Sequence, residues 1–142
     1  MTALAVADEV LKVLGVVYPA TPEPQWAQLG APILTCQSTA VGVISSSELP
    51  LFPDNAKCGS IDNHTLMLVI ARECGITFDQ EGRTVPAKIE AVSRTMETDA
   101  EALDNVLDTL NGDERIIGVP SISYLNEGGL AVTSMTIVVT DV

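Results

Sequence analysis

Residues 89–110, IEAVSRTMETDAEALDNVLDTL, form the most regular pattern in this sequence. Their apolar positions recur every three or four residues, which is the period of an amphipathic α-helix. These positions are Ile89, Val92, Met96, Ala100, Leu103, Leu107 and Leu110. Thr98 followed by Glu101 is also a capping-box pattern, so the stretch is either one long helix or two helices that meet near Thr98. We favour a break at Thr98.

The residues on the amino-terminal side of this stretch predict another helix and two strands. Residues 3–17 place their apolar side chains on one helical stripe, and a long proline-rich connection follows them. Residues 33–44 are rich in Thr, Val and Ile and predict a strand that bends or breaks near Gly42. Residues 45–63 are rich in turn-forming residues and predict a long loop. Residues 65–72 are apolar on both faces and predict a strand at the centre of a sheet.

The carboxyl-terminal side predicts a β-hairpin. Two runs of β-branched residues, 116–125 and 130–140, are separated by Asn126, Glu127, Gly128 and Gly129. Pro120 cannot donate a backbone hydrogen bond, so the first strand should start late or lie at a sheet edge there. The order of elements predicts an α+β fold. We expect one domain over residues 1–142: a mainly antiparallel sheet with an N-terminal helix and one or two central helices on one face, ending in the hairpin.

Length, composition and charge exclude several functions. The 142 residues are the length of one ordinary domain, and 46% hydrophobic residues are enough for its core. Nineteen acidic and seven basic residues give a formal net charge of −12, which disfavours tight binding of DNA or RNA. The longest apolar run, residues 66–71, is too short to span a membrane, so we expect no membrane association. The first basic residue is Lys12, so no secretory signal is expected and the chain should reside in a cytoplasm.

The sequence contains no familiar catalytic or nucleotide-binding motif, and we expect neither a cofactor nor a metal site. Cys36, Cys58 and Cys74 are an odd number without C-x-x-C spacing, which disfavours disulfides and zinc. His64 is the only histidine. Together with Asp62 and Cys36 it allows one enzymatic hypothesis, a Cys/His/Asp nucleophilic set, although each residue also has a simpler structural interpretation.

An acidic run crosses the central helical stretch and contains no basic residue before Arg115. It is either a solvated helix face or a negative surface that binds divalent cations or repels polyanions. The spacing after Asp108 does not match a calcium-binding loop. The mean hydropathy of +0.31 is high for so charged a chain, so we also expect oligomerisation. The run consists of Glu97, Asp99, Glu101, Asp104, Asp108, Asp113 and Glu114.

The order of these features resembles the tail terminator proteins of long-tailed bacteriophages, particularly siphoviruses that infect actinobacteria. The resemblance extends over most of the chain, and its motifs are short. Besides the N-terminal helix they are Thr35-Cys36-Gln37, Leu51-Phe52-Pro53 leading to Cys58-Gly59, Arg72-Glu73-Cys74-Gly75, the helix start at Pro86, and Asp99-Ala100-Glu101-Ala102-Leu103. Many proteins with this pattern carry more cysteines near the first strands than this chain does.

The resemblance implies a virion structural protein at the neck of the phage, assembled in the host cytoplasm and without catalytic activity. Such a protein forms a homo-oligomeric, hexameric ring on the tail tube, stops tube growth and provides the docking surface for the head-side connector or stopper protein. DNA passes through the ring without specific binding. Candidate residues for the acidic lumen are Asp99, Glu101, Asp104 and Asp108. Candidate contacts with other subunits or with the tail tube protein are Leu51, Phe52, Asn126, Glu127 and Gly128.

Two further alternatives remain open from the sequence. The first is another neck protein, a head-completion or stopper protein. The second is an acidic binding module that mimics nucleic acid and occupies a basic host protein.

Overall fold

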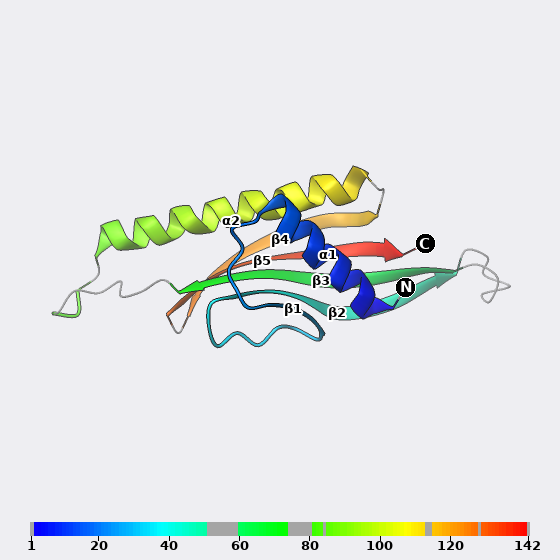
Figure 1. Cartoon of the computed structure of the whole chain (residues 1–142), viewed down its shortest axis with the longest axis horizontal. Helices are drawn as coiled ribbons and strands as arrows, with labels where there is room; N and C mark the ends of the chain where they lie inside the picture. Colours follow the sequence, from blue (N-terminus) through cyan, green and yellow to red (C-terminus); the bar gives the residue numbers. More distant parts are fainter. Residues whose placement is uncertain are drawn as a thin grey trace.

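The computed structural model describes residues 2–50, 60–73, 81–83, 85–112, 115–127 and 129–141. These residues form an α+β fold in which two helices pack on a five-stranded, mostly antiparallel sheet (Figure 1), which confirms the predicted fold class. The strand order is β1-β2-β3-β5-β4, and only the β1–β2 pair is parallel. The elements are α1 (Ala3–Val17), β1 (Gln25–Leu29), β2 (Ser38–Pro50), β3 (Ser60–Glu73), α2 (Pro86–Gly112), β4 (Ile116–Glu127) and β5 (Leu130–Asp141).

Helix α1 coincides with the helix predicted over residues 3–17. The hydroxyl oxygen of Thr2 caps its first turn by accepting a 3.2 Å hydrogen bond from the backbone N–H of Ala5. Val10 and Leu14 of the predicted stripe are completely buried, whereas Leu4, also assigned to it, is 41% exposed. Val6, which the predicted stripe did not include, is completely buried as well. The helix is therefore held mainly by its apolar face, as its sequence pattern indicates.

Strand β3 lies at the centre of the sheet, as the apolar stretch 65–72 predicts. Its alternate residues Leu66, Leu68 and Ile70 belong to the core beneath the helices. The intervening residues Val69 and Ala71 belong to a second buried cluster on the opposite face. Both faces of the strand are buried, which is why its sequence shows no alternation between apolar and polar residues.

The strands before β3 differ from the prediction. The predicted strand 33–44 is shifted, because β2 begins only at Ser38 and continues to Pro50. The predicted loop 45–63 is wrong at both ends, because residues 45–50 continue β2 and residues 60–63 already belong to β3. The two segments pair with each other after a register shift between Val43 and Ser45. Residues 51–59 lie outside the described part of the chain.

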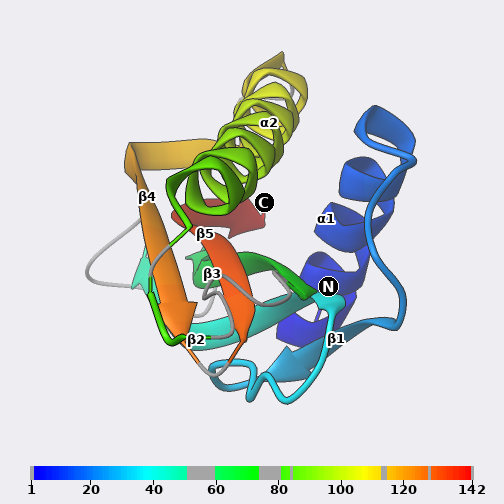
Figure 2. The ribbon, with the colours of Figure 1, turned by 90° about the vertical axis from the view of Figure 1, so that its left-hand side faces the viewer.

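Strand β1 and the path of residues 30–37 also differ from the prediction. Strand β1 falls within the predicted proline-rich connection and pairs with residues 39–43 of β2. Residues 30–37 then pass along the face of the sheet opposite the helices (Figure 2). Gly42 makes this close approach possible, because a Cβ atom there would lie 2.7 Å from Pro32 Cδ and closer still to the carbonyl oxygen of Gly30. The predicted bend or break near Gly42 corresponds to the register shift between Val43 and Ser45, and Gly42 itself is where residues 30–32 pass close to the strand.

Helix α2 is a single continuous helix of 27 residues, so the predicted break at Thr98 is wrong. The hydroxyl of Thr98 donates a 3.1 Å hydrogen bond to the carbonyl of Arg94, one turn earlier, and does not cap a new helix. Met96 and Leu103 on either side are both buried, so the apolar face passes through the capping-box pattern without interruption. Packing therefore overrides the local capping signal.

The predicted C-terminal hairpin is confirmed as β4 and β5. Its first strand is an edge of the described sheet, and its register shifts between Ile117 and Ser121, around Pro120, as the missing backbone donor predicts. The strands extend further than predicted, because Glu127 already pairs with Leu130. The turn is correspondingly shorter than the predicted four residues.

Candidate functional site

Four exposed acidic residues in the second half of α2 and just before it form one continuous line along the helix. Glu97, Glu101, Asp104 and Asp108 follow one another at intervals of four, three and four residues, which places them on one face. All four are exposed, and we call them the acidic stripe. Arg94 precedes the first stripe residue, Glu97, by three residues, and the sequence has no further basic residue before Arg115. The helix therefore supplies no basic residue beside Glu101, Asp104 and Asp108.

Asp99 is not part of this surface, which corrects its prediction as a surface residue. Its side chain is only 1% exposed and accepts hydrogen bonds from Arg72 Nε at 2.8 Å and Arg72 Nη2 at 2.9 Å. Asp99 lies three residues after Met96 and four before Leu103, in phase with the buried face of α2. This spacing is the signal in the sequence that identifies Asp99 as a core residue.

Tyr18 completes the buried cluster around Asp99. Its hydroxyl donates a 3.0 Å hydrogen bond to Asp99 Oδ1 and accepts a 3.1 Å bond from Arg72 Nη2. Burial, followed by the hydrogen bond to Asp99, raises the pKa of the Tyr18 phenol above its ordinary value of 10.0. The hydrogen bonds to Asp99 likewise raise the pKa of the Arg72 guanidinium. The cluster joins the end of α1, the centre of α2 and strand β3, so its role is structural.

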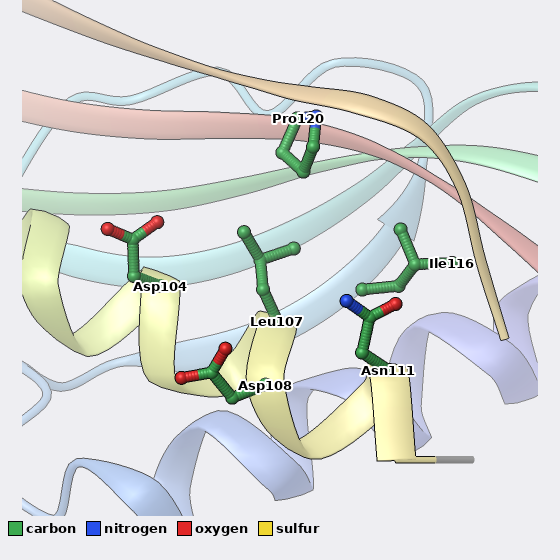
Figure 3. A pocket seen from close by; sticks show the side chains of 6 residues that line it. All are labelled: Asp104, Leu107, Asp108, Asn111, Ile116 and Pro120. Carbon is green, nitrogen blue, oxygen red and sulfur yellow. The ribbon is translucent and has the colours of Figure 1, made fainter. Parts of the chain in front are cut away.

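A hollow with a volume of about 390 Å³ lies between the second half of α2 and the beginning of β4 (Figure 3). In this view Leu107 points from the helix toward Pro120 on the strand. Two residues of the acidic stripe, Asp104 and Asp108, stand on the helix side of the same hollow, so it combines apolar walls with two carboxylates. We call it the acidic hollow. It is lined by Asp104, Leu107, Asp108, Asn111, Ile116 and Pro120.

The residues of the hypothetical nucleophilic set are not brought together. His64 is buried on the helix side of β3, and its Nδ1 atom lies 2.7 Å from the hydroxyl of Ser46. Cys36 is exposed and lies two residues before Ser38, whose partner on β3 is Ala71. Because Ala71 is seven residues from His64, the two positions on β3 are roughly 23 Å apart. Cys36 therefore lies near the end of β3 that is remote from His64, and no contact joins the two side chains among those described.

Of the five predicted contact residues, the structure describes two. Leu51, Phe52 and Gly128 lie outside the described residues. Asn126 is exposed at the end of β4, and Glu127 is the last residue of that strand. Neither lies in the turn itself, so the prediction that they form the hairpin tip is wrong by two residues.

Several exposed apolar side chains were not among the predicted contacts. Ile33 is 82% exposed and Val16 is 80% exposed. Leu29 lies on the edge strand β1, and Tyr124 and Leu125 lie on the edge strand β4. The only signal for them in the sequence is the high mean hydropathy, which gives no position.

Among the described residues, no group of three or more His, Cys, Asp or Glu side chains is arranged to hold a metal ion. Within the same residues, no helix is both long and apolar enough to cross a membrane. No model of a known protein family matches the chain, and a search of curated proteins finds no matching sequence.

Proposed function

We propose that this protein is a structural protein of a phage virion, a tail terminator that forms a homo-oligomeric ring on the tail tube of a long-tailed phage. The observation that supports this proposal best is the acidic stripe, an exposed line of carboxylates along the longest helix of the described residues. The order of helix, strands, helix and hairpin is also the one that the resemblance implies. In this role the protein stops tube growth and offers a docking surface to the head-side connector.

The acidic stripe suits a ring through which DNA must slide. Phosphates are repelled by carboxylates at distances up to about a Debye length, roughly 8 Å at physiological ionic strength. Glu101, Asp104 and Asp108 remain as lumen candidates, and Glu97 joins them because it lies on the same face. Asp99 leaves this set because its charge is compensated by Arg72.

The surface of the domain also suits assembly. Edge strands β1 and β4 carry exposed apolar side chains: Leu29 is 65% exposed, Tyr124 is 55% exposed and Leu125 is 52% exposed. Edge strands offer unpaired backbone groups to another chain, and exposed apolar side chains favour burial in an interface. A nucleic-acid mimic needs the acidic surface alone, so these apolar side chains favour the structural protein over the acidic binding module.

The proposal is tested by negative-stain microscopy of the purified, tagged protein mixed with tail tubes assembled from the tube protein of the same genome. We expect a ring or tag at one end of each tube. Decoration along the whole tube, or none by a folded protein, would contradict the terminator role. Isolation on headless tails distinguishes the terminator from a stopper, because a stopper arrives with the head.

The role of the stripe is tested separately by the triple variant Glu101→Lys, Asp104→Lys and Asp108→Lys. We expect slower DNA ejection from virions that carry it, because the lumen would then attract phosphates. The matched control is the reversal to Lys of three acidic residues that are exposed outside α2, Asp8, Glu23 and Glu73. Equal ejection rates in the two variants would remove the stripe from the lumen and leave the ring proposal standing.

A further inference from the structure

The two edge strands of the described sheet carry almost no charge. No residue from 25 to 47 is charged, and this range contains all of β1. Residues 116–126, which make up β4 except for its last residue, are also uncharged. Natural proteins commonly protect exposed edge strands with charged side chains, because an unprotected edge pairs readily with another strand. Both edges lack this protection in a chain that has nineteen acidic and seven basic residues.

A second copy of this chain is the partner that the charge distribution favours. Copies with a net charge of −12 repel one another, so they approach most easily where neither carries a charge. Both edges also expose apolar surface, at Leu29 on β1 and at Tyr124 and Leu125 on β4. Because every copy has one edge of each kind, pairing of β1 with β4 of a neighbour covers both edges, whereas pairing of β4 with itself leaves β1 exposed.

The topology sets the direction of this pairing. Strand β1 is parallel to β2, and each of the pairs β2–β3, β3–β5 and β5–β4 is antiparallel. Strand β4 therefore runs opposite to β1. When the sheet of one copy continues into the sheet of the next, with the helices on the same side, β4 and β1 meet as an antiparallel pair. This is the slightly more stable of the two kinds of strand pair.

The two faces of the sheet restrict the register. Trp26 and Leu125 lie on the face away from the helices, because both align with residues of the buried cluster on that face. Ala27 and Tyr124, their neighbours in sequence, lie on the helix side. A continuous sheet brings side chains of the same face together, and a shift of one residue would exchange the faces. Trp26 therefore meets Leu125 or a residue an even number of positions away.

Only one of these alignments uses all five residues of β1 favourably. It places Trp26 opposite Leu125 and Leu29 opposite Ile122, so that apolar side chains are neighbours across the contact. This part of β4 pairs with β5 without interruption. A shift of two residues would carry β1 either past the end of β4 or onto Pro120, which has no backbone donor.

We propose that β1 of one copy pairs with β4 of the next, antiparallel, with Gln25–Leu29 opposite residues 126–122. The contact joins different surfaces of the two copies, so it is heterologous and closes into a ring when the rotation between copies is suitable. The two helices cover one face of the sheet (Figure 2), so the acidic stripes of all copies lie on one side of the ring wall. This inference rests on the proposed ring and names the contact that would build it.

Crosslinking between introduced cysteines tests the register. The background is the chain without its natural thiols, Cys36→Ser, Cys58→Ser and Cys74→Ser. Into it we introduce Gln28→Cys and Ser123→Cys, which the proposed register places opposite each other. Opposite residues in a sheet have Cβ atoms about 5 Å apart, so a short bis-maleimide can join them. The reaction is run on the free chain and on the chain mixed with tail tubes.

We expect the double variant to give a ladder of covalent multimers on a denaturing gel, because each contact then contains both thiols. Gln28→Cys alone and Ser123→Cys alone should remain monomeric, since each contact then contains one thiol. The matched control is Ser45→Cys with Ser93→Cys, two exposed serines outside both edge strands, which should give no ladder.

A lysine in the contact tests the energetics. Leu29→Lys and Leu125→Lys each lower the net negative charge, so overall repulsion between copies decreases and any weaker association arises at the edge itself. We expect association at least about tenfold weaker by sedimentation velocity. Val16→Lys and Ile33→Lys, at positions 80% and 82% exposed outside β1 and β4, should associate like the wild-type chain. Circular dichroism verifies that all four variants are folded.

Three outcomes would overturn the contact. They are a double variant that gives no ladder either free or with tail tubes, a crosslinked dimer from Ser123→Cys alone, which would show that β4 pairs with itself, and lysine variants that associate like their controls. In each case the terminator proposal stands if the wild-type chain still binds one end of the tube. A chain that gives the expected ladder and binds no tube end would keep the contact and contradict the terminator proposal.

Discussion

The two parts of α2 have the same secondary structure and opposite surroundings. From Met96 to Leu110 the helix buries seven residues and packs on the sheet and on α1. From Pro86 to Thr95, a segment that we call the helical arm, it buries none. One helix therefore contains a segment held by tertiary packing and a segment held mainly by local interactions.

The difference shows how a helix can extend beyond the core that supports it. Pro86 occupies the first helical position, where its fixed φ is favourable and its missing N–H is not needed. Ala87, Lys88 and Ala91 have high helix propensity, and the Glu90–Arg94 ion pair spans one turn. Since adding a residue to an existing helix is far easier than starting one, the packed part can propagate into the arm.

Hydrogen exchange should reveal the largest difference between the two parts. In the monomer we expect opening free energies within about 2 kcal/mol of zero for the amides of the arm, and values near the global stability, of order 5–15 kcal/mol, for residues 99–110. The measurement is native-state exchange followed by NMR. Equal protection along all of α2 in a monomer would contradict the comparison.

Truncation of one apolar residue in each part should give the next largest difference. Leu103→Ala removes a completely buried side chain and should lower the free energy of unfolding by about 3–4 kcal/mol. Ile89→Ala removes a half-exposed side chain and raises helix propensity, so its effect should stay within about 0.5 kcal/mol. Urea unfolding of dilute monomers measures both, and similar losses would show that the arm is packed in the monomer.

Loss of the buried Arg72–Asp99 ion pair should cost more stability than loss of an exposed acidic residue of α2. Asp99→Ala leaves Arg72, which is 22% exposed, without its carboxylate, so we expect a loss of about 3 kcal/mol in the free energy of unfolding. Glu97→Ala, on the exposed face, should change it by less than about 0.5 kcal/mol. If the double variant Arg72→Met with Asp99→Leu recovers most of the loss, the pair itself is the cause; a loss that persists would point to a different role for Asp99.

The pH dependence of stability should give the smallest effect. Burial and Asp99 raise the pKa of Tyr18 above 10.0, so the neutral phenol is favoured in the folded state. Its contribution is fully present below pH 10 and is lost as the pH rises through the raised pKa. We expect this contribution to the free energy of unfolding to be less than about 1 kcal/mol, because the phenol is partly solvated. Unfolding curves of the wild-type chain and of Tyr18→Phe should diverge with pH only above pH 10, and parallel curves there would contradict the shift.

The sequence predicts the elements whose periodicity is long. Residues 3–17 and 89–110 repeat with the period of a helix over four turns or more, and the hairpin strands are long runs of β-branched residues. Strand β1 escapes prediction because it has five residues and lies beside Pro22 and Pro24, which are typical of a loop. Its strand conformation comes from pairing with β2, which the local sequence does not contain.

The candidate site is less predictable for the same reason. The exposure of Glu101, Asp104 and Asp108 agrees with their prediction as surface residues, because their spacing is local to one helix. Asp99 is buried together with its partner Arg72, which precedes it by 27 residues, and a local sequence pattern cannot reveal that ion pair. The acidic hollow forms between α2 and β4, and the position of β4 beside α2 depends on the order of the strands in the sheet.

The pairing of β3 with β5 has a consequence for how the chain folds. Its register joins residues as distant as Asp62 and Asp141, whereas β2–β3 and β4–β5 pair strands that follow one another in sequence. The β3–β5 pairing, which we call the central seam of the sheet, therefore closes a loop in the chain that contains all of α2. Pairing of residues so distant in sequence slows folding. We expect the two neighbouring pairs to form first and the seam to limit the rate. Substitutions at the seam should then slow refolding, and substitutions in the helical arm should leave its rate unchanged.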